Sequence, residues 1–138
     1  MLGDISAQDF LQQYWQQKPL MVRQALTGYV SPISPDELAG LALEPEVESR
    51  LVEGKSRDWS LRHGPFTEQD FLQLPEQDWT LLVQAVDLWV PQVQQLLERF
   101  DFLPPWRLDD VMVSFACPGG SVGPHFDQYD VFLLQVEG

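Results

Sequence analysis

Apolar residues at helical spacing predict a helix near the start of the chain. Ser6 suits the N-cap position, and Asp9 follows it by three residues, as a capping acid does. The apolar residues after this start share one helical face, which we expect to pack in the core: Phe10, Leu11, Tyr14 and Trp15. Lys18-Pro19 is expected to end the helix, because the residue before a proline disfavours helical backbone.

Three later stretches carry helix start signals of the same kind. Ser34-Pro35-Asp36-Glu37 is the strongest, because it combines an N-cap serine, a proline at the first helical position and a capping acid. That helix should end at Glu44-Pro45 and bury Leu38, Leu41 and Ala42. Thr67-Glu68-Gln69-Asp70 predicts a short helix that Leu74-Pro75 closes. Pro91 predicts the first turn of a helix whose apolar face holds Val93, Leu96, Leu97 and Phe100.

Short apolar runs between these helices predict strands. Val47 to Val52 and Trp59 to His63 are expected to form a hairpin joined by the polar segment 53–57, and Leu20 to Val22 is a further strand candidate. Thr80 to Val86 fits a buried strand or a helix, and periodicity does not decide between them. We favour the strand, because the run is short and contains β-branched residues.

The last part of the chain, from Asp109 onward, is expected to be β-structure. Val111 to Ala116 is predicted as one strand, a glycine-rich turn follows at 118–123, and Val131 to Val136 is predicted as a second strand. Everything before it mixes helices and strands. This order predicts an α+β chain in which residues 1–108 form a mixed shell and residues 109–138 begin a β-barrel or jelly roll.

Composition and charge describe a single globular domain with an acidic surface. The 138 residues are 44% hydrophobic and 12% aromatic, which argues against disorder. The net charge is −13, from 21 acidic and 8 basic residues, so the surface should repel a nucleic-acid backbone and attract a basic protein. An equally good interpretation is that the charge keeps the domain soluble.

Nothing in the sequence points to export or to a membrane. Met1 to Ile5 lacks the basic and apolar regions of a signal peptide, and no apolar run is long enough to span a bilayer. Cys117 is the only cysteine, which excludes an internal disulfide and fits a reducing compartment. We interpret it as a small buried residue rather than a nucleophile. A cytoplasmic location is therefore expected.

The motif that carries candidate chemistry is His125-Phe126-Asp127, an H-x-D at the start of the second predicted strand. In extended backbone His125 and Asp127 should project together, while Phe126 points into a core. An imidazole beside a carboxylate supplies two ligands of the two-histidine, one-carboxylate triad of non-haem Fe(II) oxygenases. Such a pair also occurs as an ordinary hydrogen bond. The other histidine, His63, has no metal partner at useful spacing and is expected to be structural or exposed.

Several longer stretches are more specific than the H-x-D. Two of them lie near the end of the chain, at 103–114 (LPPWRLDDVMVS) and at 118–132 (PGGSVGPHFDQYDVF). Others lie upstream, at Pro32 to Ala39, Ser49 to Val52, His63 to Phe66 and Leu81 to Val86. Together they run in order along nearly the whole chain, and they resemble the bacterial ribosomal oxygenases of the JmjC, cupin-like group.

The resemblance implies an Fe(II)- and 2-oxoglutarate-dependent protein hydroxylase on a double-stranded β-helix (jelly roll, cupin-like) fold, acting on an arginine of a large-subunit ribosomal protein. It implies that His125 and Asp127 are metal ligands, with no catalytic residue beyond them. Ser114 is implied to line the 2-oxoglutarate pocket, where its hydroxyl can hydrogen-bond a carboxylate. The implied partner is a basic ribosomal protein, with no direct contact to nucleic acid or membrane, and a homodimer is implied for the longer protein.

The family pattern extends beyond the residues of this chain. In the family, the third iron ligand (a histidine) and the arginine that binds the distal carboxylate of 2-oxoglutarate come from later strands, and His63 does not match that ligand. The chain is therefore expected to be the N-terminal part of a single JmjC/cupin-like domain, with residues 109–138 as its first metal-binding strands. Two alternatives stay open: a truncated, catalytically inactive cupin-like fragment that at most binds a protein partner, and a cupin-like domain with a structural metal or none.

Overall fold

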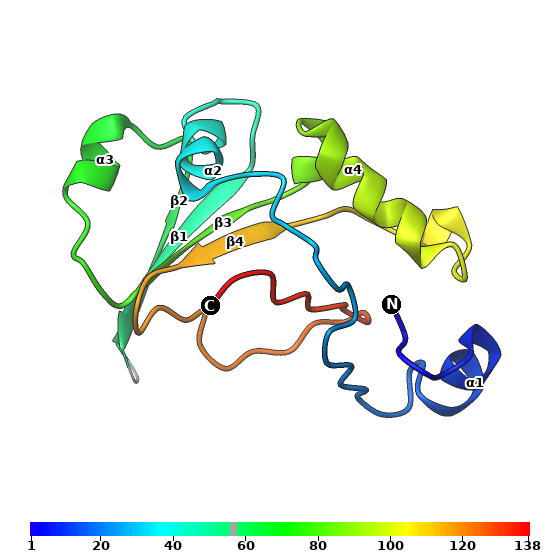
Figure 1. The fold of residues 1–138 in the computed structure, drawn as a ribbon. Coiled ribbons are helices and arrows are strands. Elements are labelled where there is room, and N and C mark those ends of the chain that lie inside the picture. The colour runs from blue at the N-terminus through cyan, green and yellow to red at the C-terminus, as the bar shows by residue number, and fades with distance from the viewer. Residues whose placement is uncertain (56–57) are drawn as a thin grey trace.

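A four-stranded antiparallel sheet forms the centre of the protein (Figure 1). The computed structural model describes residues 1–55 and 58–138. The strand order is β2-β1-β3-β4, with bounds β1 Ser49–Lys55, β2 Asp58–His63, β3 Trp79–Val83 and β4 Val113–Ala116. The first two strands form the predicted hairpin, in which Arg50 lies opposite His63. Residues 56 and 57 of the expected joining segment lie outside the described residues.

The predicted α+β class is confirmed, and so are the predicted helix starts. The helices are α1 Ala7–Gln13, α2 Pro35–Leu41, α3 Glu68–Leu72 and α4 Pro91–Leu97, with short 3-10 turns η1 Val86–Leu88, η2 Glu98–Phe100 and η3 Pro105–Arg107. The side chains of Ser6, Ser34 and Thr67 each accept a hydrogen bond from the backbone three residues on, which satisfies a free N–H of the first turn. Pro91 begins α4 as expected.

The two faces of the sheet have different surroundings. One face packs against α2, whose Leu38 joins the core formed with Leu51, Leu81 and Val83 of the sheet, as does Ala42 at the C-cap of the helix. The other face, called here the second face, holds the residues that alternate with these. The strand register places one row of four residues across it: His63, Arg50, Leu82 and Ser114.

One predicted helix is shorter in the structure, and two predicted strands are not formed. α1 ends at Gln13 rather than at Lys18-Pro19, and Gln16 then adopts left-handed backbone with a φ of 57°. Leu20 to Val22 and Val131 to Val136 are irregular rather than strands. A strand is held by hydrogen bonds to a neighbour, and the described residues place no strand beside either segment.

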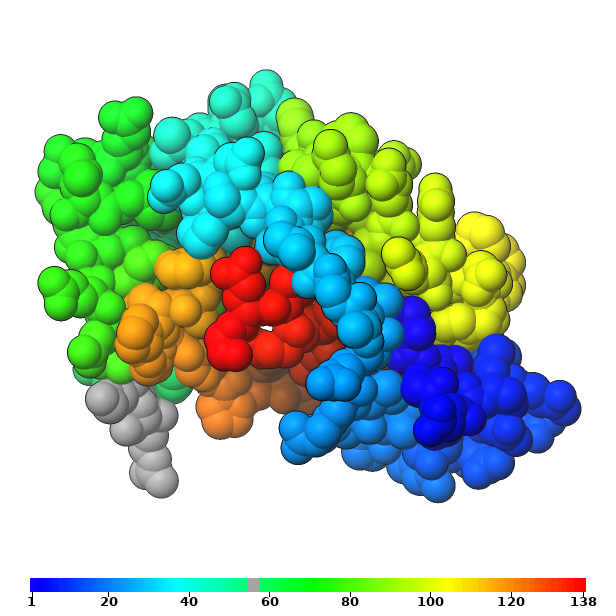
Figure 2. Space-filling model, viewed as in Figure 1, coloured from blue at the N-terminus to red at the C-terminus, as the bar shows by residue number. Residues whose placement is uncertain are grey.

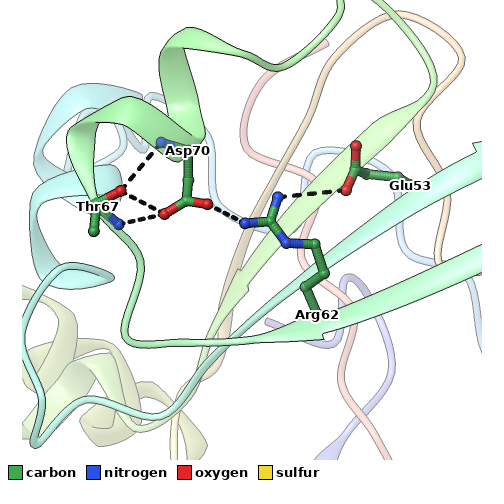
Figure 3. Close-up of polar contacts among 4 residues, drawn as sticks. All are labelled: Glu53, Arg62, Thr67 and Asp70. Carbon is green, nitrogen blue, oxygen red and sulfur yellow. Dashed lines mark hydrogen bonds and ion pairs between the residues drawn. The ribbon is translucent and has the colours of Figure 1, made fainter.

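Arg62 of β2 ties the sheet to α3 (Figure 3). Its guanidinium forms an ion pair with Asp70 of α3 and lies 3.8 Å from Glu53 Oε2 of β1. The hydroxyl and then the backbone N–H of Thr67 lower the pKa of Asp70 by hydrogen bonding to its carboxylate, and Arg62 lowers it further. The same capping arrangement, with Ser34 as donor, lowers the pKa of Glu37.

An aromatic cluster joins the two ends of the chain. Phe132 lies 4.8 Å from Phe100, 5.9 Å from Phe10 and 6.0 Å from Trp15, measured between ring centroids, and 6.2 Å from Phe102. Figure 2 shows the C-terminal residues (red) enclosed by the segment after β4 (orange) and by the stretch that precedes α2 (light blue). The cluster therefore holds the C-terminal segment in place although it forms no strand.

In the described part of the chain, none of the helices combines the length and the apolar character that crossing a membrane requires. The division into a shell at 1–108 and barrel strands at 109–138 stays a prediction.

Candidate metal centre

The segment that follows β4 runs over the second face of the sheet. Figure 1 shows it (orange to red) on the side of the sheet away from α2. A Cβ added at Gly123 would lie 3.4 Å from the indole ring of Trp59, and Trp59 belongs to the second face because it pairs with Gly54 in the register. The H-x-D segment therefore approaches the same face that carries Ser114.

A tight glycine turn directs the chain from β4 onto this face. Gly119 has a φ of 79°, a conformation that glycine adopts without strain, and a Cβ at Gly120 would collide with the carbonyl oxygen of Trp79. The turn is fastened by Gly120 N–H to the Cys117 carbonyl at 2.8 Å and by Asp78 N–H to the Pro118 carbonyl at 3.0 Å. Cys117 itself is buried, as expected.

His125 and Asp127 face one another at the end of this segment. His125 Nε2 lies 3.7 Å from Asp127 Oδ2, and both side chains are partly open to solvent. His125 Nδ1 lies 3.1 Å from the carbonyl oxygen of Gly123. Because a carbonyl only accepts, this contact places a proton on Nδ1 and leaves Nε2 on the side of the Asp127 carboxylate.

This pair fits two positions of a divalent metal site. Metal-bound histidines commonly donate their second ring N–H to a carbonyl or carboxylate, which fixes the tautomer and aims the other nitrogen at the metal. His125 has this arrangement, with Nδ1 on the carbonyl oxygen of Gly123. Within residues 1–55 and 58–138, no group of three or more His, Cys, Asp or Glu side chains gathers to hold a metal. The described residues therefore offer two ligands and leave the remaining positions to other donors.

The local structure around the pair differs from the prediction. His125 and Asp127 come together from an irregular segment rather than from the start of a buried strand. Phe126 is 82% exposed, so it does not point into a core. The alternation that brings the two ligands together holds over three residues, but the neighbouring strand that would bury Phe126 is lacking among the described residues.

His63 and Ser114 lie at opposite ends of the row across the second face. His63 is exposed on the outer strand β2, as the sequence interpretation expected. Ser114 is exposed on β4, opposite Leu82, with its hydroxyl on the face over which the H-x-D segment runs. Its position is compatible with a pocket-lining role.

Sequence reasoning missed one polar group on this face, Arg50 of β1. Its Nη2 donates to Gln84 Oε1 at 2.8 Å and lies 3.9 Å from Met112 Sδ. Gln84 in turn donates from Nε2 to Asp110 Oδ2 at 2.7 Å. The sequence contained one signal for this group: Arg50 stands directly before the apolar residues Leu51 and Val52 in a predicted strand.

Comparison with known proteins shows what the chain is similar to. Residues 95–138 match the family model described as the JmjC domain. The chain is 51% identical over 130 residues to the ribosomal protein uL16 3-hydroxylase of Escherichia coli, covering 94% of this chain and 34% of the relative. It is 45% identical over 135 residues to a probable ribosomal oxygenase of Haemophilus influenzae, covering 97% of this chain and 33% of the relative.

Solved structures of a ribosomal oxygenase are also similar to this chain, in fold as well as in sequence. The ribosomal oxygenase YcfD of Escherichia coli, in complex with cobalt and 2-oxoglutarate, superposes with a TM-score of 0.84 at 48% identity. The same protein in complex with cobalt and succinic acid gives the same values, and in both cases the match covers 91% of this chain and 34% of the other. The chain spans about a third of the length of the curated relatives it matches. By sequence and by fold, the chain is similar to bacterial ribosomal oxygenases over about a third of their length, and its last 44 residues match the JmjC domain.

Proposed function

We propose that this chain supplies the first part of the active site of an Fe(II)- and 2-oxoglutarate-dependent protein hydroxylase. The observation that carries the proposal is His125 Nε2 facing the Asp127 carboxylate while Nδ1 is held by the Gly123 carbonyl. Cobalt and 2-oxoglutarate in the complex of the similar Escherichia coli protein support the choice of metal class and cosubstrate.

In this proposal His125 and Asp127 hold the metal, and Ser114 donates a hydrogen bond to a carboxylate of 2-oxoglutarate. When bound there, Fe(II) supplies the redox chemistry that couples decarboxylation of 2-oxoglutarate by O2 to hydroxylation of a substrate carbon. The chain's own residues provide orientation: the Gly123 carbonyl fixes the imidazole, and the glycine turn after β4 sets the segment over the second face.

The proposed substrate is a basic large-subunit ribosomal protein, hydroxylated on an arginine. The name of the Escherichia coli relative, ribosomal protein uL16 3-hydroxylase, supports a ribosomal protein. The net charge of −13 favours a basic partner over nucleic acid. We further propose that the protein works in the cytoplasm, without membrane contact, and that a longer polypeptide containing this chain forms a homodimer.

A non-catalytic role is the second candidate function. Two protein ligands alone hold a divalent metal weakly, and the described residues gather no third. Phe126 and Leu133 expose 82% and 90% of their surface, which is typical of a segment that a further element or partner covers. A cupin-like fragment that binds a protein partner without turnover is compatible with both observations.

A titration with Mn(II), with and without 2-oxoglutarate, separates the two functions. His125→Ala tests the ligand, and His63→Ala is the matched control because it removes the other histidine. The hydroxylase proposal expects Mn(II) binding that 2-oxoglutarate strengthens, that His125→Ala abolishes and that His63→Ala leaves unchanged. Mn(II) binding that is absent, or the same in His125→Ala, contradicts it and favours the partner-binding role. A positive result is followed by assaying succinate release and mass gain of a basic ribosomal protein.

A further inference from the structure

Residues 121–127, which carry the H-x-D, form no hydrogen bond to the sheet in the described part of the chain. Their hydrogen bonds are internal: Gly123 N–H donates to Ser121 Oγ at 3.1 Å, and His125 Nδ1 donates to the Gly123 carbonyl at 3.1 Å. The ion-pair contact between His125 and Asp127 is internal as well. Apart from the chain connection at the glycine turn, the position of this segment over the second face (Figure 1) therefore depends on van der Waals contact.

Trp59 of β2 provides such a contact at Gly123. A Cβ added at Gly123 would lie 3.4 Å from Cε2, 3.5 Å from Nε1 and 3.7 Å from Cδ2 of the indole. These are van der Waals distances, so the ring lies on the side of Gly123 where any other residue would carry its side chain. Trp59 pairs with Gly54 in the register, and β1 therefore places no side chain beside the indole on the second face. The half-buried indole instead meets the segment that runs above it.

A movement of Gly123 reaches His125 with little slack. Pro124 stands between the two residues, and its ring fixes one of its own two backbone torsions. The Gly123 carbonyl is also the acceptor that holds His125 Nδ1. A displacement of Gly123 therefore changes both where the imidazole is attached and which way it turns. It changes with them the distance from Nε2 to Asp127 Oδ2, which is 3.7 Å here.

We propose that Trp59 is a positioning residue for the candidate metal centre. Its indole supports Gly123 at the height from which the Gly123 carbonyl holds Nδ1 of His125 and leaves Nε2 on the side of Asp127. Trp59 acts through this glycine rather than by direct contact with the proposed ligands. Residues that orient a ligating histidine through its second nitrogen are worth about 10- to 100-fold in metal affinity. This inference rests on the proposed function.

The first test reads the tautomer of His125 in the metal-free chain by 15N NMR, at about pH 8.5, where an ordinary imidazole is neutral. A free neutral ring favours the proton on Nε2, whereas the bond to the Gly123 carbonyl requires it on Nδ1. We expect the Nδ1–H form in the parent chain and a shift toward the Nε2–H form in Trp59→Ala. Trp59→Phe should keep most of the Nδ1–H form, because a second aromatic ring fills part of the same space. Trp106→Ala is the matched control, since it removes a different indole, which is 78% exposed on η3.

The second test is Mn(II) titration of the same variants. Trp59→Ala should weaken Mn(II) binding by about tenfold, the typical effect of disturbing the partner of a ligating histidine. Trp59→Phe should weaken it less, and Trp106→Ala should leave it unchanged. A loss of Mn(II) binding in Trp59→Ala with the Nδ1–H form intact would contradict the proposal, because the indole would then act by another route than the orientation of His125.

A third measurement needs no variant, so it decides the matter even if Trp59→Ala unfolds. In the parent chain, nuclear Overhauser contacts should join the indole protons of Trp59 to the Hα protons of Gly123. If these contacts are absent, if Trp59→Ala keeps the Nδ1–H form, or if Trp106→Ala loses it equally, Trp59 does not position His125 and the hydroxylase proposal stands without it. If the parent chain binds no Mn(II), the proposed function fails, while the tautomer and the Overhauser contacts still decide whether Trp59 holds His125.

Discussion

His125 Nδ1 donates to the carbonyl oxygen of Gly123, two residues before it, across 3.1 Å. This local bond turns the ring so that Nε2 faces the carboxylate of Asp127. Gly123 has a φ of 72°, and a Cβ added there would lie 3.4 Å from the Trp59 ring. The orientation of the candidate metal ligand therefore depends on a glycine rather than on another side chain.

Gly123→Ala should weaken Mn(II) binding by about tenfold, because a disturbed partner of a ligating histidine typically costs metal affinity on that scale. The new Cβ meets the Trp59 ring at 3.4 Å and strains the left-handed backbone. Isothermal titration calorimetry measures the effect. Gly28→Ala is the control, since its φ of 74° is equally strained but nothing lies within 4 Å of the added Cβ. Equal losses in both variants would contradict a specific role for Gly123.

Gly120→Ala should destabilise the fold by about 2 kcal/mol or more, because the added Cβ collides with the backbone carbonyl of Trp79. Gly40→Ala should have the opposite sign and stabilise by about 0.5 to 1 kcal/mol. Gly40 lies in α2 with nothing within 4 Å of the added Cβ, and alanine is the better helix former. Urea unfolding followed by tryptophan fluorescence gives both values. A neutral Gly120→Ala would show that the turn shifts freely.

Phe132→Ala should cost about 2 kcal/mol of unfolding free energy, because Phe132 contacts four other aromatic rings. Leu133→Ala, one residue further on, should change stability by less than about 0.5 kcal/mol because Leu133 is 90% exposed. The same urea unfolding experiment compares them. If the two variants are equally stable, the aromatic cluster does not hold the C-terminal segment.

Asp70→Asn should flatten the acid side of the stability profile. The Thr67 hydrogen bonds and then Arg62 lower the pKa of Asp70 in the folded state, so its stabilisation is present above the unfolded pKa and is lost as pH falls through the folded value. Thermal unfolding between about pH 2 and pH 6 should therefore show a shallower slope below about pH 4 in Asp70→Asn. Glu68→Gln, which removes another acid of α3, is the control. Identical slopes in the parent chain and Asp70→Asn would refute the predicted linkage.

The local signals in the sequence predicted the helix starts well. Ser6, Ser34 and Thr67 cap their helices as expected, because capping depends on residues only three positions apart. The hairpin of β1 and β2 and the strand after Thr80 were also predicted, although β3 ends at Val83, before the expected Val86. The strands expected at 20–22 and 131–136 did not form, since apolar runs become strands only beside a partner.

The sequence by itself determined the caps, the hairpin, the glycine turn and the H-x-D spacing, because each depends on contacts between residues close along the chain. Only the tertiary structure decided which side chains share the second face. The register of three strands sets Arg50, Leu82 and Ser114 in one row, and hydrogen bonds that run from β1 through Gln84, the residue after β3, to the segment before β4 fix the Arg50 guanidinium. Such contacts join residues at least 26 positions apart, and their pairing is selected by the packing of the whole sheet against α2 rather than by any local pattern.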